Sequence, residues 1–232
     1  MNYTDLIYLS NFTQTEGDGK VVNVLTEDGR DVVVLNQTIF YPQGGGQPYD
    51  QGYIESGDAK FAVEQVRFVD GIVRHIGKFE SGQFKPGAEV KLLVDSQRRD
   101  LNSKLHSVGH LVDMAVWELK LGWMPGKGYH FPDGAYVQYS GELGDTDREK
   151  LKLELENACN RIIELSLEVK AVFMDRNEMQ KVCHFVPDYL PEGKPGRVVV
   201  FGDFGVPCLD LRPFAQEPEK KNPWDKFTGG II

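Results

Sequence analysis

The fold is decided by the stretch DSQRRDLNSKLHSVGHLVDMAVWELKLG, residues 95–122, which has the pattern of one long amphipathic helix. Either Asp95 or Ser96 is suited to cap the start of this helix, and Gly122 is suited to end it. The apolar residues recur at intervals of three and four and predict one buried stripe, which consists of Leu101, Leu105, Val108, Val112, Ala115 and Leu119.

A second face of the same helix is marked by two histidines. At about 100° per residue, His106 and His110 point away from the apolar stripe, together with Asp113 and Trp117. One helical turn is the spacing that aims two imidazoles at one metal ion. The alternative is that both histidines are ordinary polar or partly buried residues.

A metal site at this face needs a further ligand. Catalytic zinc usually has three protein ligands and an open position, whereas structural zinc is closed by four ligands. Cys208 is favoured because it follows a strand and the loop 202–207, which would deliver a thiolate from a distant part of the sequence. The other candidates are Cys183, His184, His130, Asp113 and Asp210.

Composition limits the class of protein. The chain has 232 residues, of which 41% are hydrophobic and 26% charged, as in ordinary globular proteins, and no apolar run approaches the roughly 20 residues of a membrane span. Three cysteines do not make a disulfide framework, and the N-terminus lacks the pattern of a secretory signal, so we expect a reducing cytoplasm. A net charge of -9 excludes broad coating of nucleic acid but allows local contact, for which the basic groups are Arg98, Arg99 and Lys104, and Lys220, Lys221 and Lys226.

The first part of the chain has the pattern of a small β-barrel. Short β-rich runs are broken by turn signals, and the expected strands are 21–25, 32–35, 61–69, 72–76 and 90–94. After Asp95 the pattern changes to α+β. We therefore predict an α+β chain with a β-barrel domain over 1–94, an α+β domain over 95–215 and a polar tail over 216–232.

The second part alternates strands and helices. Thr146 and Glu149 predict a capping box for a helix whose core stripe is Leu151, Leu155, Ala158, Ile162 and Leu165. Further strands are expected at 136–139, 169–174 and 197–201, with a short helical segment at 177–182. Cys159 and Cys183 are expected to be free core thiols.

A glycine-rich segment lies between the expected strands, at FYPQGGGQP, residues 40–48. Three consecutive glycines cost conformational entropy, which indicates positive φ angles or close approach of the backbone to a ligand. A plain β-turn explains the segment equally well.

Together these motifs resemble the editing domain of alanyl-tRNA synthetase and its free-standing AlaX-type relatives. The resemblance rests on 40–52, on 95–99 with 106–111, and on 202–208, in that order along the chain. It implies a β-barrel followed by an α+β catalytic domain and a zinc-dependent, ATP-independent hydrolase, an aminoacyl-tRNA deacylase, whose partner is mischarged tRNA rather than DNA or a membrane. Serine or glycine wrongly joined to alanine tRNA is the implied substrate.

The resemblance also implies roles for particular residues. Zinc would be held by His106, His110 and Cys208, and the pocket would be bordered by Gly44, Gly45, Gly46 and Gln47. Arg212 is expected to pair with a phosphate or carboxylate near the site, because its planar fork makes charge-assisted contacts. No residue is identified as the general base.

One departure from the family pattern affects the predicted metal site. The family's second motif has a histidine four residues after the cysteine, whereas this chain has Arg212, which cannot ligate a metal because it stays protonated. Three ligands suffice for a catalytic zinc with an open position. The alternative is a degenerate editing-like module that binds tRNA or a protein without turnover.

Overall fold

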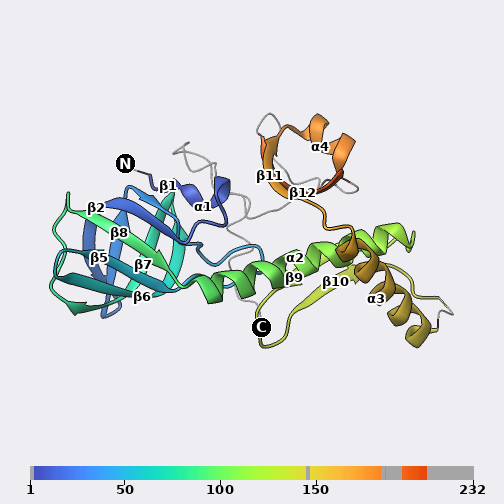
Figure 1. Cartoon of the computed structure of the whole chain (residues 1–232), viewed down its shortest axis with the longest axis horizontal. Helices are drawn as coiled ribbons and strands as arrows, with labels where there is room; N and C mark the ends of the chain where they lie inside the picture. The colour runs from blue at the N-terminus through green and yellow to red at the C-terminus, as the bar shows by residue number, and fades with distance from the viewer. Residues whose placement is uncertain (1–2, 145–146, 184–185, 187–194, 208–232) are drawn as a thin grey trace.

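A closed barrel and an α+β part share one long helix in this computed structural model, which describes residues 3–144, 147–183, 186 and 195–207. Helix α2 (Ser96–Glu118) runs from the barrel at one end of the molecule to α3 (Arg148–Glu164) at the other (Figure 1). The arrangement confirms the predicted α+β class with an N-terminal β-barrel.

Six antiparallel strands close the barrel in the order β2-β3-β7-β6-β5-β8. Their bounds are β2 (Glu16–Glu27), β3 (Arg30–Leu35), β5 (Gly52–Ser56), β6 (Ala59–Val69), β7 (Ile72–Ser81) and β8 (Glu89–Val94). Strand β5 was not predicted, because Ile54 is the one fully buried apolar residue in it and a single residue shows no alternation. The core is filled by inward side chains such as Val33, Phe61 and Leu92, each fully buried.

The N-terminal segment covers one end of the barrel. Strand β1 (Asp5–Leu6) pairs with β4 (Gln37–Thr38), and the single turn α1 (Ile7–Ser10) follows directly. Tyr8 and Leu9 of α1 are buried against Tyr41, whose ring meets that of Tyr8 edge to face at 5.4 Å. This contact places α1 beside the glycine-rich segment.

Helix α2 begins as predicted and ends earlier than predicted. The Asp95 side chain caps it by accepting from the backbone N–H of Arg98. At the other end Lys120 has φ of 55°, and the N–H groups of Lys120 and Leu121 bond to the carbonyls of Trp117 and Val116, as in a Schellman motif. The prediction that Gly122 ends the helix was therefore wrong by two residues.

The buried face of α2 also differs from the predicted one. Leu101 and Val108 of the predicted apolar stripe are 48% and 50% exposed, and Trp117 is 57% exposed. The buried residues along the first five turns are instead polar or small: Arg99, Asn102, His106, Gly109 and Asp113. The histidine face is thus the face that packs, and Arg99, His106 and Asp113 on it find polar partners in the barrel part and a neighbouring hairpin.

The α+β part is built from a hairpin, two helices and a sheet. The hairpin is β9 (Met124–Tyr129) with β10 (Tyr136–Ser140), and the antiparallel sheet has the order β11-β12-β13, namely β11 (Val169–Met174), β12 (Gly196–Phe201) and β13 (Phe204–Pro207). Helix α3 packs on α2 through Ala158 and Ile162, and α4 (Arg176–Val182) packs on the sheet through Met179.

Two local predictions in this part need correction. Helix α3 is capped by Asp147, which accepts from the N–H groups of Glu149 and Lys150, whereas Thr146 lies outside the described residues. Leu165, predicted to be in the core, is 66% exposed. A capping box does occur at α4, between Asp175 and Glu178.

The two described cysteines are free thiols, as predicted. Cys159 packs at the edge of the α2–α3 core, and Cys183 packs near Met179 and Val198. Burial raises the pKa of the Cys183 thiol to about 11, so it stays protonated at neutral pH. Among the helices of the described residues, none is long and apolar enough to cross a membrane.

A buried ion pair fastens the start of α2 to the barrel. The Arg99 guanidinium binds the Asp50 carboxylate, with side chains 6% and 0% exposed. Its remaining N–H groups donate to the carbonyls of Phe12 and Ile39, and Asp50 also accepts from the Tyr41 N–H. Every charged atom of the pair therefore has hydrogen-bond partners, which is the condition under which a buried ion pair is tolerated.

We expect Asp50→Ala to lower the free energy of unfolding by about 3–5 kcal/mol, because it leaves the Arg99 charge buried without its counterion. The matched control is Asp100→Ala in the same helix, whose pair with Lys104 is 61% and 72% exposed and should contribute about 0.2–1 kcal/mol. Urea denaturation measures both. Equal losses in the two variants would contradict the role given to the buried pair.

A second buried polar group lies inside the barrel. His75 is fully buried, and its Nε2 and Nδ1 lie 2.8 Å from Thr38 Oγ1 and 2.9 Å from the Val33 carbonyl oxygen. The carbonyl can only accept, so Nδ1 carries the hydrogen and Nε2 accepts from the threonine hydroxyl. Burial lowers the pKa of His75 from 6.5 to about 4, so the ring is neutral in the folded protein.

Burial of a neutral His75 predicts that the free energy of unfolding depends on pH in the acid range. Because the folded pKa lies below the unfolded value of 6.5, the stabilisation is complete above pH 6.5 and is lost as the pH falls toward 4. We expect the wild-type free energy of unfolding to fall by up to about 1.4 kcal/mol per pH unit more steeply in this window than that of His75→Asn. Urea titrations at several pH values test this, and parallel profiles would refute it.

Candidate functional site

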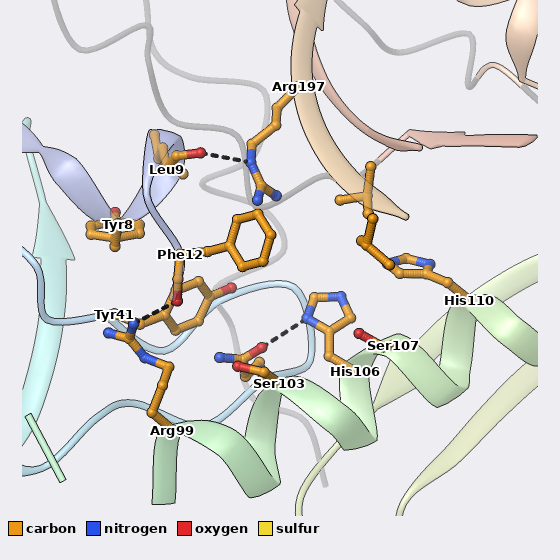
Figure 2. A pocket seen from close by; sticks show the side chains of 13 residues that line it. Tyr8, Leu9, Phe12, Tyr41, Arg99, Ser103, His106, Ser107, His110 and Arg197 are labelled. Atoms are coloured by element: carbon orange, nitrogen blue, oxygen red, sulfur yellow. Dashed lines mark hydrogen bonds between the residues drawn. The ribbon is translucent and has the colours of Figure 1, made fainter. Parts of the chain in front are cut away.

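A cavity of about 80 Å³ lies where the barrel, α2 and the β11–β12 sheet meet. Side chains from α1, the glycine-rich segment, α2 and β12 line it, and Figure 2 shows the α2 residues along one side with Arg197 reaching in from the other. The lining residues are Tyr8, Leu9, Phe12, Tyr41, Gln47, Arg99, Ser103, His106, Ser107, His110, Val169, Arg197 and Val199.

The two predicted histidines lie together at this cavity. The rings of His106 and His110, on consecutive turns of α2, are 4.9 Å apart between centroids and tilted by 35°. His106 Nδ1 lies 2.9 Å from Gln47 Oε1. Since the amide oxygen can only accept, Nδ1 donates, and the lone pair of the neutral ring is on Nε2. The hydrogen bond therefore fixes the tautomer in which Nε2 can act as a ligand or a base.

Behind His110 lies a short polar chain. Asp113 Oδ2 is 3.6 Å from His110 Nδ1, and Asp113 Oδ1 accepts a hydrogen bond from the Tyr139 hydroxyl. Burial, and next the Asp113 carboxylate, raise the pKa of Tyr139, so the phenol remains a donor. Asp113, considered from sequence as a metal ligand, thus lies on the Nδ1 side of His110, where it can orient the ring.

A third histidine packs flat against His106. His130, at the end of the β9 strand, is 5% exposed, and its ring is 4.6 Å from that of His106 with 15° between the planes. Its backbone N–H donates to the Gly46 carbonyl at 2.8 Å. Because stacked rings direct their nitrogens in parallel planes, His130 is placed to support His106 rather than to share a metal with it.

The glycine-rich segment forms a tight turn that makes room for this stack. Gly45 and Gly46 have φ of 52° and 78°, and Gly44 and Gln47 are joined by two backbone hydrogen bonds. A Cβ added at Gly46 would lie 2.3 Å from the Gly128 carbonyl oxygen. Of the four residues predicted to border the pocket, Gln47 lines the cavity, while Gly44, Gly45 and Gly46 form the turn that presents it.

The described residues fit two positions of a zinc site. His106 presents its Nε2 lone pair in a tautomer fixed by Gln47, and His110 lies one turn away. Within the described residues, no three or more His, Cys, Asp or Glu side chains are grouped to hold a metal. The predicted third ligand Cys208 lies outside the described residues, as do His184, Asp210 and Arg212, while Cys183 packs in a separate apolar cluster.

Arg99 and Arg197 were not identified as site residues from sequence, and the stacking of His130 on His106 was not predicted. His130 was considered as a metal ligand and Arg99 as part of a basic surface group, but neither partner could be read from the sequence because Asp50 and His106 are 49 and 24 positions away. Arg197 begins a strand, where its pattern gives no sign of a role.

Comparisons with known proteins agree with this geometry. Residues 1–98 match the family model described as tRNA synthetases class II (A). The chain is 32% identical over 204 residues to alanyl-tRNA editing protein AlaX-L of Pyrococcus horikoshii, covering 87% of this chain and 49% of that protein. It is 31% identical over 202 residues to alanine–tRNA ligase of Pseudomonas entomophila, covering 75% of this chain and 22% of the ligase.

The chain belongs to the family of alanyl-tRNA synthetase editing domains and AlaX-type proteins. It spans about half the length of its AlaX-L relative and about a fifth of the ligase. The resemblance found in the histidine and glycine motifs is thereby confirmed.

The stacked rings of His106 and His130 lie against Gly109, and they predict that Gly109→Ala destabilises the protein. Alanine normally stabilises a helix by about 1 kcal/mol over glycine, but the new Cβ would lie 2.4 Å from His130 Cε1. We expect a net loss of about 1–3 kcal/mol in thermal or urea unfolding, because the buried ring has to move.

The control for this prediction is Gly134→Ala in the hairpin connection, where an added Cβ meets no atom within 4 Å. It should leave the stability nearly unchanged. A Gly109→Ala variant more stable than wild type would show that the His130 ring is not confined against α2.

Proposed function

We propose that this protein is a zinc-dependent deacylase that hydrolyses the ester of mischarged tRNA, with alanine tRNA carrying serine or glycine as substrate. The observation that carries the proposal is the pair His106 and His110 on one cavity wall, with the His106 tautomer held by Gln47. A relative of the chain is named for alanyl-tRNA editing, which supports the same reaction class. We place the activity in the cytoplasm.

The residues have separate tasks in this proposal. His106, His110 and Cys208 would hold the metal, which would supply polarisation of the ester carbonyl. Gln47 keeps the lone pair of His106 on Nε2, and His130 keeps the ring in its plane by stacking. Asp113 steadies His110 from the Nδ1 side. Gln47, His106, Asp113 and His130 are buried, and groups removed from water exert a stronger electrostatic effect on a nearby carbonyl.

A second candidate function is favoured by Arg212. Because this residue stands where the family motif has a histidine, the chain has lost one possible ligand. The alternative is a tRNA- or protein-binding module without turnover. Metal content separates the two functions: protein purified without chelator should contain about one zinc per chain if it is the deacylase, and no stoichiometric metal if it is the binding module.

The decisive test measures the deacylation of alanine tRNA charged with serine or with glycine, by wild type and by His106→Ala. We expect the variant to lose at least about 100-fold in kcat/KM and most of its bound zinc, because a ligand is removed. The matched control is Val108→Ala on the same helix, a 50% exposed residue whose loss should change neither quantity. Unchanged deacylation by His106→Ala would refute the role given to this residue.

A further inference from the structure

Arg197 is a buried cation that lines the cavity, and no anion among the described residues neutralises it. Arg197 is 7% exposed, and its Nε donates to the Leu9 carbonyl oxygen at 3.2 Å. Throughout the described residues, no carbonyl, amide or carboxylate oxygen accepts from either of its two terminal NH₂ groups. Figure 2 shows this end of the side chain extending into the cavity, opposite the helix that carries His106.

Arg99, which lines the same cavity, provides the contrast. Its three guanidinium nitrogens are all engaged, with Asp50, Phe12 and Ile39, and its charge is balanced by the Asp50 carboxylate. Arg99 therefore has a complete structural explanation. Within the described part of the chain, Arg197 makes only its Nε hydrogen bond, although the two residues are similarly buried, at 5% and 7% exposure.

An unbalanced guanidinium is costly in such a place. Arginine keeps its charge in proteins, and removing a charge from water without a partner costs several kcal/mol in effective terms. A planar fork with two open NH₂ groups matches the oxygens of a phosphate or a carboxylate. The geometry thus describes an anion site that shares a cavity with the two histidines.

We infer that Arg197 binds the phosphodiester that precedes the terminal nucleoside of the RNA substrate. The inference rests on the proposed function. In an aminoacyl ester the carboxyl group of the amino acid is consumed by the bond, and its ammonium group would be repelled by a guanidinium. The phosphodiester on the same nucleoside is then the nearest anion that the substrate offers, and Arg197 recognises it while the ester faces the histidine side of the cavity.

The test uses two minimal substrates that differ in one phosphate. One is adenosine 5′-monophosphate esterified with serine on its ribose, and the other is adenosine esterified in the same way. The readout is the ratio of their kcat/KM values within one protein preparation, so that a general loss of folded protein cancels. For wild type we expect a ratio of about 10 to 100 in favour of the phosphate-bearing ester, the range for hydrogen bonds to charged groups.

Arg197→Gln should reduce this ratio to near one, and Arg197→Lys should leave an intermediate ratio because it keeps the charge and loses the fork. The control is Lys170→Gln on the neighbouring strand β11, which removes the same charge from a 63% exposed side chain and should keep the wild-type ratio. A wild-type ratio in Arg197→Gln overturns the inference while the proposed function stands.

A binding measurement covers the case in which wild type hydrolyses neither ester. Calorimetry then compares adenosine 5′-monophosphate with adenosine, each titrated into wild type and Arg197→Gln. Tighter binding of the monophosphate that disappears in Arg197→Gln supports the anion site although the deacylase proposal has failed. Equal binding of the two compounds by wild type overturns the anion site.

Discussion

The buried Arg99–Asp50 pair is the interaction on which the rest of the structure depends. Asp50 lies between the glycine-rich turn and strand β5, and Arg99 lies in the first turn of α2, so their contact fixes where the helix leaves the barrel. His106 follows Arg99 by seven residues, which is close to two helical turns and returns to the same face. The ion pair therefore sets the direction in which both the helix and its histidines meet Gln47 and His130.

This dependence explains why the buried face of α2 is polar. Arg99, His106 and Asp113 each face a partner from another element, namely Asp50, Gln47 and Tyr139. Burying a polar group costs little once its hydrogen bonds are made inside the protein, and Leu101 and Val108 lie on the exposed side of the helix. Hydrophobic periodicity assumes that the packed face is the apolar one, and here the assumption fails in the half of the helix that forms the site.

The sequence was sufficient for features that depend on local pattern. The barrel, the start of α2 at Asp95, strand β11 and the short helix α4 follow from alternation, capping and turn residues, which act between near neighbours. The sequence was insufficient where a structural feature depends on contacts that its pattern does not reveal. The left-handed residue at the end of α2 is Lys120 because the Schellman bonds to Trp117 and Val116 outweigh the cost of a positive φ, so Gly122 is not needed there. The role proposed for Arg197 depends on a cavity whose earliest lining residue, Tyr8, lies 189 positions before it.

The acidity of the chain makes the location of its cations matter more than their number. With a net charge of -9, the long-range field opposes an RNA, and exposed lysines on α2 or β11 act through water that screens them. A guanidinium at 7% exposure acts through a medium of lower dielectric, so one buried arginine contributes more to a correctly docked phosphate than several surface lysines do. Such an arrangement attracts an RNA little at long range and gives its phosphate a strong contact once the phosphate has entered the cavity. Under the proposed function, an acidic protein can in this way reject nucleic acid in general and still hold one chain end whose phosphate and ester fit the same cavity.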